Sequence, residues 1–183
     1  MNIANPFIDS WNILIKNLGT IIISLIIVVI LSVVTLGILY IPLLIGLQML
    51  FVKAKRGQAI SSNEVLDPIK RYFSLVFGSM GIGILIFFGI LLFIVPGLAW
   101  ASWWMYAALY IYDKNMHIED GMRSSKEVVR KNGTWWHLLF LVVAWVIDNV
   151  VIWFIGPIGF LLKFITTPLT MGAIACAYAD ESQ

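Results

Sequence analysis

The chain has little charge. Asp, Glu, Lys and Arg make up only 12% of its 183 residues, against about 25% in soluble domains, while 61% of the residues are hydrophobic. This composition excludes both a soluble globular domain and a disordered chain, and it indicates a protein of the lipid bilayer. The net charge is only +2, which is too small to indicate nucleic-acid binding. We therefore expect no nucleic acid among its partners.

The sequence also has few residues that carry catalytic or metal chemistry. The single cysteine, Cys176, excludes an intrachain disulfide and a cysteine-based metal cluster. His117 and His137 are not three or four residues apart, and there is no His-Glu-x-x-His motif. Residues 78–83 lack the Gly-x-Ser-x-Gly spacing of a serine nucleophile, and no Lys-Ser/Thr of a phosphate loop follows. We expect no cofactor, no metal site and no enzymatic activity.

Long apolar runs dominate the rest of the chain. Residues 19–39 contain no charge, and about 20 apolar residues are enough to cross the hydrocarbon core of a bilayer. Later runs are interrupted by breaks that contain Pro and Gly, at 95–97 and 156–159, which indicate hairpins. We predict a single all-α domain over 1–183, an integral membrane bundle of six transmembrane helices in three hairpins. The predicted spans are 19–39, 40–55, 75–95, 98–112, 135–155 and 158–179.

An amphipathic segment precedes each predicted hairpin. In the first segment, Phe7 and Trp11 share one helical face while Asp9 and Lys16 lie on the other. Helices of this kind lie in the membrane interface with their apolar face toward the acyl chains. We predict short interfacial helices at 5–18, 67–74 and 118–132.

The order of helix and hairpin indicates a weak internal repeat. Pro42 and Gly46 in the second predicted span have the same spacing as Pro168 and Gly172 in the sixth. Short apolar motifs also coincide by chance in membrane proteins, so a threefold repeat and a coincidence both stay open as interpretations.

The basic residues predict the orientation. All but one of the twelve Lys and Arg residues fall on one side of the predicted membrane, and the exception is Lys163. The positive-inside bias assigns that side to the cytoplasm, so both termini are expected there. The basic clusters on this side either contact anionic lipid headgroups or only fix the topology. The predicted headgroup contacts are Lys53, Lys55, Arg56, Lys70, Arg71, Arg123, Lys126, Arg130 and Lys131.

Several short motifs in the second half of the chain carry a family resemblance. They are, in order, Val95-Pro96-Gly97, an aromatic span, a short helix that ends in Arg130-Lys131-Asn132-Gly133, and Trp135-Trp136 at the start of the next span. This order resembles the membrane region of some prokaryotic glycerophosphodiester phosphodiesterases and of related multi-pass families of unknown function. In those enzymes the chemistry resides in a separate soluble barrel domain. The resemblance therefore implies a membrane module of a prokaryotic inner membrane and does not imply hydrolysis.

Asp148 is the most unusual residue within the predicted spans. An ionisable side chain inside a membrane segment is costly, and it is a functional-site candidate by default. Asp148 and its neighbour Asn149 could form a proton or cation site together with Gln48, or Asp148 could form a structural pair with Lys163. Gln48 alone is interpreted as an interhelical hydrogen-bonding residue.

These features leave three functions to compare. The first is a non-enzymatic membrane protein with a structural, lipid-organising or accessory role, and the alternative is a small transporter or channel with Asp148 in its path. An enzyme acting on lipids is third, because no acid-base or nucleophile pair is visible. The expected partners are membrane lipids, with anionic headgroups on the cytoplasmic side, and a protein partner or a second copy of the chain. A tightly packed interior would favour the first function, and a polar cavity at mid-depth the second.

Overall fold

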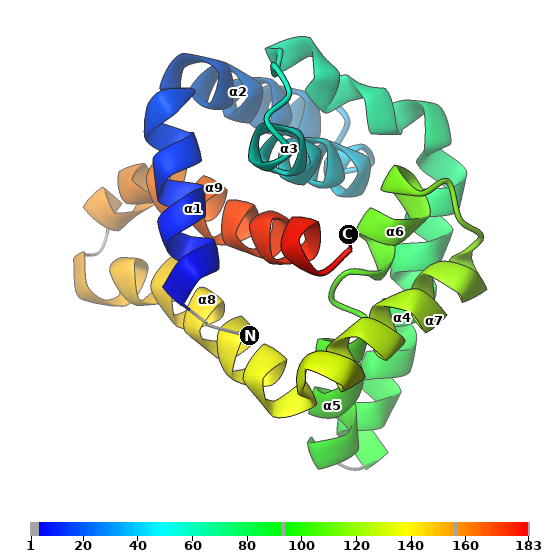
Figure 1. Cartoon of the computed structure of the whole chain (residues 1–183). Helices are drawn as coiled ribbons and strands as arrows, with labels where there is room; N and C mark the ends of the chain where they lie inside the picture. Colours follow the sequence, from blue (N-terminus) through cyan, green and yellow to red (C-terminus); the bar gives the residue numbers. More distant parts are fainter. Residues whose placement is uncertain (1–3, 93, 156, 183) are drawn as a thin grey trace.

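The computed structural model describes residues 4–92, 94–155 and 157–182, and the chain is all-α over these residues (Figure 1), which confirms the predicted class. The elements in chain order are α1 (Ala4–Lys16), α2 (Leu18–Val34), α3 (Tyr40–Lys55), the 3-10 helix η1 (Ser62–Arg71), α4 (Tyr72–Leu92), α5 (Ile94–Trp103), α6 (Ala107–Asp113), α7 (Ile118–Asn132), α8 (Thr134–Ile155) and α9 (Pro157–Glu181).

Several predicted boundaries agree with the structure. Helix α3 coincides with the predicted span 40–55, α7 coincides with the predicted interfacial helix 118–132, and α1 covers most of 5–18. Gly133 ends α7 with φ at 101°, a left-handed conformation that glycine adopts without a steric cost. The local patterns of amphipathicity and helix-stop residues were therefore sufficient to place these elements.

The predicted helix at 67–74 differs from the structure. The segment is a 3-10 helix that starts at Ser62 and leads directly into α4, so Pro68 lies inside it and does not open it. The element starts earlier because Val65 is fully buried, with its backbone against Gly46 of α3. This contact comes from tertiary packing and has no local signal in the sequence.

The predicted span 98–112 is also wrong as a single helix. The chain forms α5 and α6 with a break at 104–106, and the predicted turn residues 95–97 lie within α5. Ser125 of α7 satisfies the backbone at the break, because its hydroxyl donates to Trp103 O at 2.7 Å and accepts from the Tyr106 N–H at 3.2 Å. A serine far away in the chain thus stabilises the break between α5 and α6, which the apolar sequence of this segment does not predict.

The first predicted span is shorter than expected. Helix α2 ends at Val34, and Leu36 and Gly37 follow with φ values of 50° and 82°, which reverse the chain before α3. Helices α1 and α2 meet at an angle of 95°. The 17 residues of α2 extend over about 26 Å, less than the roughly 30 Å of a hydrocarbon core.

The expectation of six full-length spans is wrong for the described residues. Two helices are long and apolar enough to cross a membrane, Ser62–Leu91 and Leu162–Glu181, and α1 with α2 make a third candidate if the bent pair counts as one span. Helices α2, α3, α5 and α6 are shorter because turns and breaks divide the apolar runs, and in α8 the described apolar stretch is Thr134–Asn149. Gly156, at the predicted last hairpin turn, lies outside the described residues.

The helices divide into an inner and an outer set. Helix α3 and the second half of α9 run through the middle of the molecule, with the other helices around them (Figure 1). Nine of the 16 residues of α3 are buried, and Phe51, Tyr106 and Tyr178 are among the largest fully buried side chains. Outer helices expose large apolar side chains, such as Phe73 and Phe87 of α4. The molecule therefore has a packed core and an apolar outside.

The three amphipathic elements pack in a cyclic order. Helix α1 packs on α9, η1 packs on α3, and α7 packs on α6. Each element therefore contacts the inner helix of the preceding hairpin, and α1 closes the ring against the last hairpin. This arrangement supports the threefold repeat as an interpretation of the fold.

The glycines of the repeated Pro-Gly pattern have matching roles in this ring. A Cβ atom on Gly46 would meet the η1 backbone at Val65, and a Cβ atom on Gly172 would meet the hydroxyl of Ser10 in α1. The Ser10 hydroxyl donates to Leu169 O of α9 at 2.8 Å. In both hairpins the glycine allows the amphipathic element to approach the inner helix closely.

Candidate functional site

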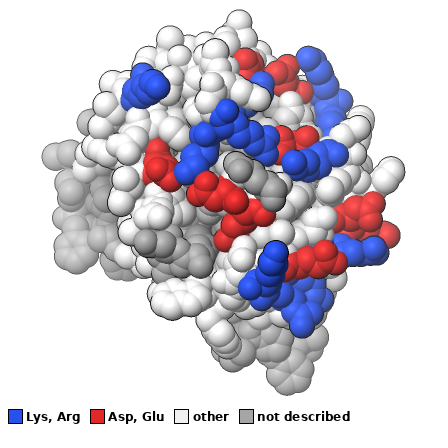
Figure 2. Space-filling view, viewed as in Figure 1, with Lys and Arg blue, Asp and Glu red and all other residues white. Residues whose placement is uncertain are grey.

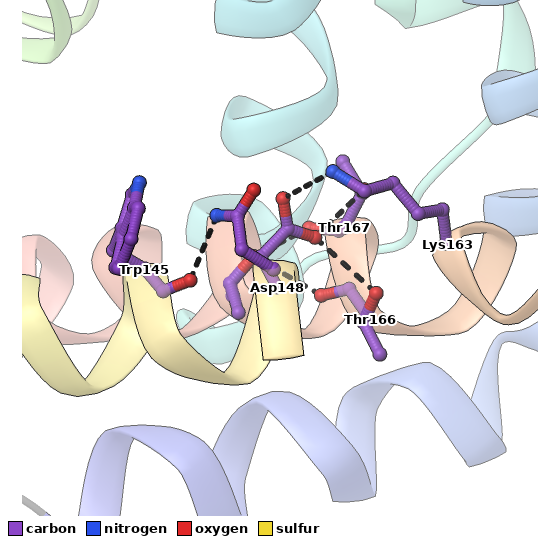
Figure 3. Close-up of polar contacts among 7 residues, drawn as sticks. Trp145, Asp148, Lys163, Thr166 and Thr167 are labelled. Atoms are coloured by element: carbon purple, nitrogen blue, oxygen red, sulfur yellow. Dashed lines mark hydrogen bonds and ion pairs between the residues drawn. The ribbon is translucent and has the colours of Figure 1, made fainter. Parts of the chain in front are cut away.

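The Asp148 carboxylate is the centre of a polar cluster between α8 and α9 (Figure 3). Lys163 Nζ lies 3.0 Å from Asp148 Oδ2, and the hydroxyls of Thr166 and Thr167 donate to Oδ1 at 3.2 and 3.0 Å. The three donors lie on the first half of α9, and Asp148 faces them from α8. The structure therefore brings Asp148 and Lys163 together, as one of the two interpretations of the sequence expected.

This cluster can balance a charge inside an apolar surrounding. One oxygen of Asp148 is paired with an ammonium group and the other accepts two hydroxyl hydrogen bonds, so both oxygens are satisfied. A buried or membrane-embedded ion is tolerated when it is paired and hydrogen-bonded in this way. The geometry matches a cross-link between α8 and α9.

The other two residues of the predicted polar site do not join the cluster. Asn149 Nδ2 donates to Trp145 O, one turn earlier in the same helix, at 2.8 Å (Figure 3). Gln48 Nε2 in α3 lies 3.4 Å from Met171 Sδ in α9. Within the described part of the chain, no hydrogen bond links Gln48 to Asp148 or Asn149. Gln48 instead makes the interhelical contact that its position predicted.

A groove of about 390 Å³ lies between α5, α8 and α9, and Asp148 and Asn149 are among its lining residues. Leu98, Leu141, Trp145, Met171 and Ile174 also line it, and nearly all of its exposed surface is apolar. A path for ions or protons needs polar groups or water along its length. The groove is better suited to apolar groups, such as hydrocarbon chains.

A second polar network joins the inner helices at their C-terminal ends. Arg56, which directly follows α3, donates to both carboxylate oxygens of Asp113 at the end of α6, at 2.9 and 2.7 Å. The Tyr178 hydroxyl of α9 donates to the same carboxylate at 2.7 Å. Burial would raise the pKa of Asp113, but the hydrogen bonds from Arg56 and Tyr178 outweigh it and hold the pKa below its ordinary value. Sequence reasoning missed this network.

Two further contacts tie the outer elements to this end. Lys55 Nζ lies 2.5 Å from Asp9 Oδ2 of α1 and 3.1 Å from Asp180 Oδ1 of α9. The fully buried His137 of α8 lies 2.9 Å from Glu181 through Nε2, and its Nδ1 lies 2.9 Å from Gly133 O. These pairs join α1, α3, α8 and α9 at one end of the bundle, where Figure 2 shows many of the Lys, Arg, Asp and Glu side chains.

The basic residues that were predicted to contact headgroups fall into two groups. One group pairs with carboxylates of the chain itself, as Lys53 does with Glu64 at 2.7 Å and Lys70 with Asp67 at 3.0 Å. In this group Lys55 and Arg56 also have acidic partners. The other group has no ion pair among the described residues: Arg71, Arg123, Lys126, Arg130 and Lys131.

Two members of the second group lie against an aromatic ring. Lys126 Nζ is 4.7 Å from the centre of the Trp103 ring, and Arg130 lies 6.0 Å from it. The indole Nε1 of Trp103 donates to the Thr134 hydroxyl at 2.9 Å. Tryptophan and basic residues favour the headgroup level of a membrane. Contact of this group with lipid stays a prediction.

The described residues contain no group of three or more His, Cys, Asp or Glu side chains that could hold a metal ion. Cys176 is buried in α9, near the buried residues Ala173, Ala175 and Ala177. No family model, curated protein or solved structure matches the chain. The resemblance to the membrane region of glycerophosphodiester phosphodiesterases therefore stays a prediction.

Proposed function

We propose that the protein is a non-enzymatic multi-pass protein of a prokaryotic inner membrane that organises lipid, or supports a partner, at the cytoplasmic leaflet. The cyclic packing of α1, η1 and α7 on α9, α3 and α6 is the observation that carries this proposal. A ring of amphipathic elements presents apolar faces to the core and basic side chains to the headgroup layer. Such a surface can bind lipid without catalysing a reaction.

The proposed orientation has both termini in the cytoplasm. Lys55, Arg56, Asp113 and Glu181 meet at one end of the inner helices, and most basic residues of the sequence belong to the segments at that end. The positive-inside bias supports this end as the cytoplasmic one. Lys163 then belongs to the outer half of the bilayer.

The short inner helices are compatible with a membrane position. Helix α3 has 16 residues, or about 24 Å, but most of its surface is buried by protein. Only the outer helices need to match the lipid, and these are uneven, because α2 has 17 residues and α4 has 21. A bilayer adapts to a short hydrophobic stretch by thinning locally. The protein should therefore thin the bilayer beside α2.

Transport through Asp148 has less support. Both oxygens of Asp148 are already hydrogen-bonded, the adjacent groove is apolar, and the core between α3, α6 and α9 is filled by large side chains. An accessory or lipid-organising function requires only this packed interior.

Spin labels on α1 test the proposal in proteoliposomes. Each variant carries its label on a single introduced cysteine. The cysteine replaces Ile15, which is exposed and apolar, or Asn12, which is exposed on the same helix and serves as the matched control. In both variants Cys176 is changed to Ala to leave one reactive thiol. We expect oxygen to relax the label at Ile15 more than a water-soluble nickel complex does, with the reverse at Asn12. Equal exposure of both labels to the nickel complex would refute an interfacial position for α1.

A further inference from the structure

An open pocket of about 850 Å³ lies where η1, α4 and α7 meet. Its lining includes Arg71 at the end of η1, Phe73 and Phe77 of α4, and His117, Glu119 and Asp120 at the start of α7. The volume is within the range of sites for small molecules. The charged part of this pocket lies beside the uncharged helix α4, so the pocket joins a polar region to an apolar one.

Arg71 differs from the basic residues near it. Lys53, Lys55, Arg56 and Lys70 each have a carboxylate partner, whereas Arg71 Nη1 donates to the backbone oxygen of Ile111 at 2.6 Å. This hydrogen bond fixes the guanidinium at the pocket wall while its positive charge stays without an acidic partner among the described residues. A fixed guanidinium is well suited to a phosphate group.

The acidic residues of the pocket are also unpaired. Glu119 and Asp120 form no ion pair among the described residues, although Arg71 lines the same pocket. Opposite charges that share a pocket without contacting each other match a ligand that carries both a phosphate and an ammonium group. The carboxylates would accept hydrogen bonds from a primary amine, which a quaternary amine cannot donate.

The apolar wall of the pocket indicates that such a ligand is a lipid and not a soluble molecule. The rings of Phe73 and Phe77 are stacked with their centres 6.2 Å apart, and they are 72% and 63% exposed. Helix α4 carries no charged residue from Tyr72 to Leu92, so the hydrocarbon region starts directly beside Arg71. A lipid can place its headgroup among the charges and its chains along these rings, and a soluble phosphate cannot use the rings.

We propose that this pocket binds a phospholipid with a primary-amine headgroup, of the phosphatidylethanolamine type, with its phosphate at Arg71 and its amine at Glu119 and Asp120. The site rests on the proposed membrane position and gives it a specific lipid. His117 is a further donor for the phosphate.

Competition between lipids measures the proposed preference. The purified full-length protein receives equal amounts of dioleoyl phosphatidylethanolamine, phosphatidylglycerol and phosphatidylcholine in detergent, and the retained lipids are counted by native mass spectrometry. We expect phosphatidylethanolamine to be retained about tenfold over either competitor, the effect of roughly one charge-assisted hydrogen bond. Equal retention of the three lipids would overturn the site. Displacement of the lipid by equimolar soluble phosphoethanolamine would show that the headgroup alone binds, and would overturn a lipid occupant.

Variants separate the two halves of the headgroup. Arg71→Gln should lower the retention of all phospholipids about tenfold, because every one of them carries the phosphate. The double change Glu119→Gln with Asp120→Asn should remove only the preference for the primary amine, and both residues are exposed, so folding should persist. Lys70→Gln is the matched control, because Lys70 is 80% exposed in its side chain and lies outside the lining. An unchanged preference in the double variant would contradict the assignment.

The result is distinguishable from a failure of the proposed function. If the labels on α1 report an interfacial position and the three lipids bind equally, only the pocket assignment is wrong. If the labels report an aqueous position, the proposed membrane function is wrong whichever lipid is retained.

Discussion

The strongest cross-link of the bundle should be the carboxylate of Asp113. Its side chain is only 9% exposed and receives two hydrogen bonds from Arg56 and one from Tyr178, so the ends of α3, α6 and α9 depend on one residue. Asp113→Asn removes the charge and one acceptor while keeping the shape. It leaves the Arg56 guanidinium, 24% exposed, without its counter-ion.

The burial of the two partners determines how much free energy of unfolding Asp113→Asn should lose. Removing one partner of a fully buried ion pair costs about 3–5 kcal/mol, and the partial exposure of Arg56 reduces this to about 2–3 kcal/mol. For a chain of this length, such a loss lowers the melting temperature by about 5–10 °C. Tyr178→Phe removes a single hydrogen bond to a charged group and should cost about 1–2 kcal/mol.

Unfolding in mixed micelles with increasing SDS, followed by tryptophan fluorescence, measures these differences. Lys70→Gln breaks an exposed ion pair at i,i+3 and serves as the control, with an expected loss of about 0–0.5 kcal/mol. A free energy of unfolding for Asp113→Asn that equals that of the control would refute the reasoning, since α3, α6 and α9 would then not depend on this carboxylate.

Three further outcomes follow from the structure. Asp148→Asn and Lys163→Gln should each lower the free energy of unfolding by about 1 kcal/mol, and the double variant should lose less than the sum; an ion flux lost in Asp148→Asn at unchanged stability would support the transporter instead. Gly46→Ala should destabilise the protein in the same SDS assay, because its Cβ would meet the η1 backbone. Gly81→Ala in α4 meets open space and should stabilise by about 0.4–1 kcal/mol. A Gly46→Ala variant as stable as Gly81→Ala would contradict the close approach. The pKa of Asp113 is lower in the folded state than its ordinary value, so its stabilisation is complete above that value and is lost as the pH falls through the folded-state pKa. The free energy of unfolding should therefore fall more steeply below about pH 4 in the wild type than in Asp113→Asn, and parallel curves would contradict this.

Patterns within short stretches of the sequence predicted the helices whose boundaries depend on those stretches alone. The amphipathic periodicity of α1 and α7 and the glycine after α7 are properties of short stretches, and they placed both helices. The pair of Asp148 with Lys163 was open to prediction because the two residues lie on consecutive antiparallel helices. The matching spacing of Pro42 with Gly46 and Pro168 with Gly172 also corresponded to matching contacts.

Contacts between segments that are far apart in the chain could not be predicted from the sequence. The break between α5 and α6 depends on Ser125, about twenty residues later, and its own sequence reads as a continuous apolar run. Arg56 and Asp113 are separated by 57 residues, and the sequence predicted only a headgroup contact for Arg56. The number of spans was overestimated for the same reason, because hydrophobicity marks burial in protein and burial in lipid alike.

Labelling from the two sides of a membrane tests whether the protein is embedded with the ring of α1, η1 and α7 toward the cytoplasm. In a background with Cys176→Ala, single cysteines replace Leu36, in the turn between α2 and α3, or Gln58, in the turn after α3. Leu36 is 92% exposed and Gln58 is also exposed, so both are accessible to a reagent. Using a membrane-impermeant maleimide on intact spheroplasts and on inverted vesicles, we expect Leu36→Cys to react only from outside and Gln58→Cys only from the cytoplasmic side. Reaction of both cysteines from the same side would contradict the proposed position in the membrane.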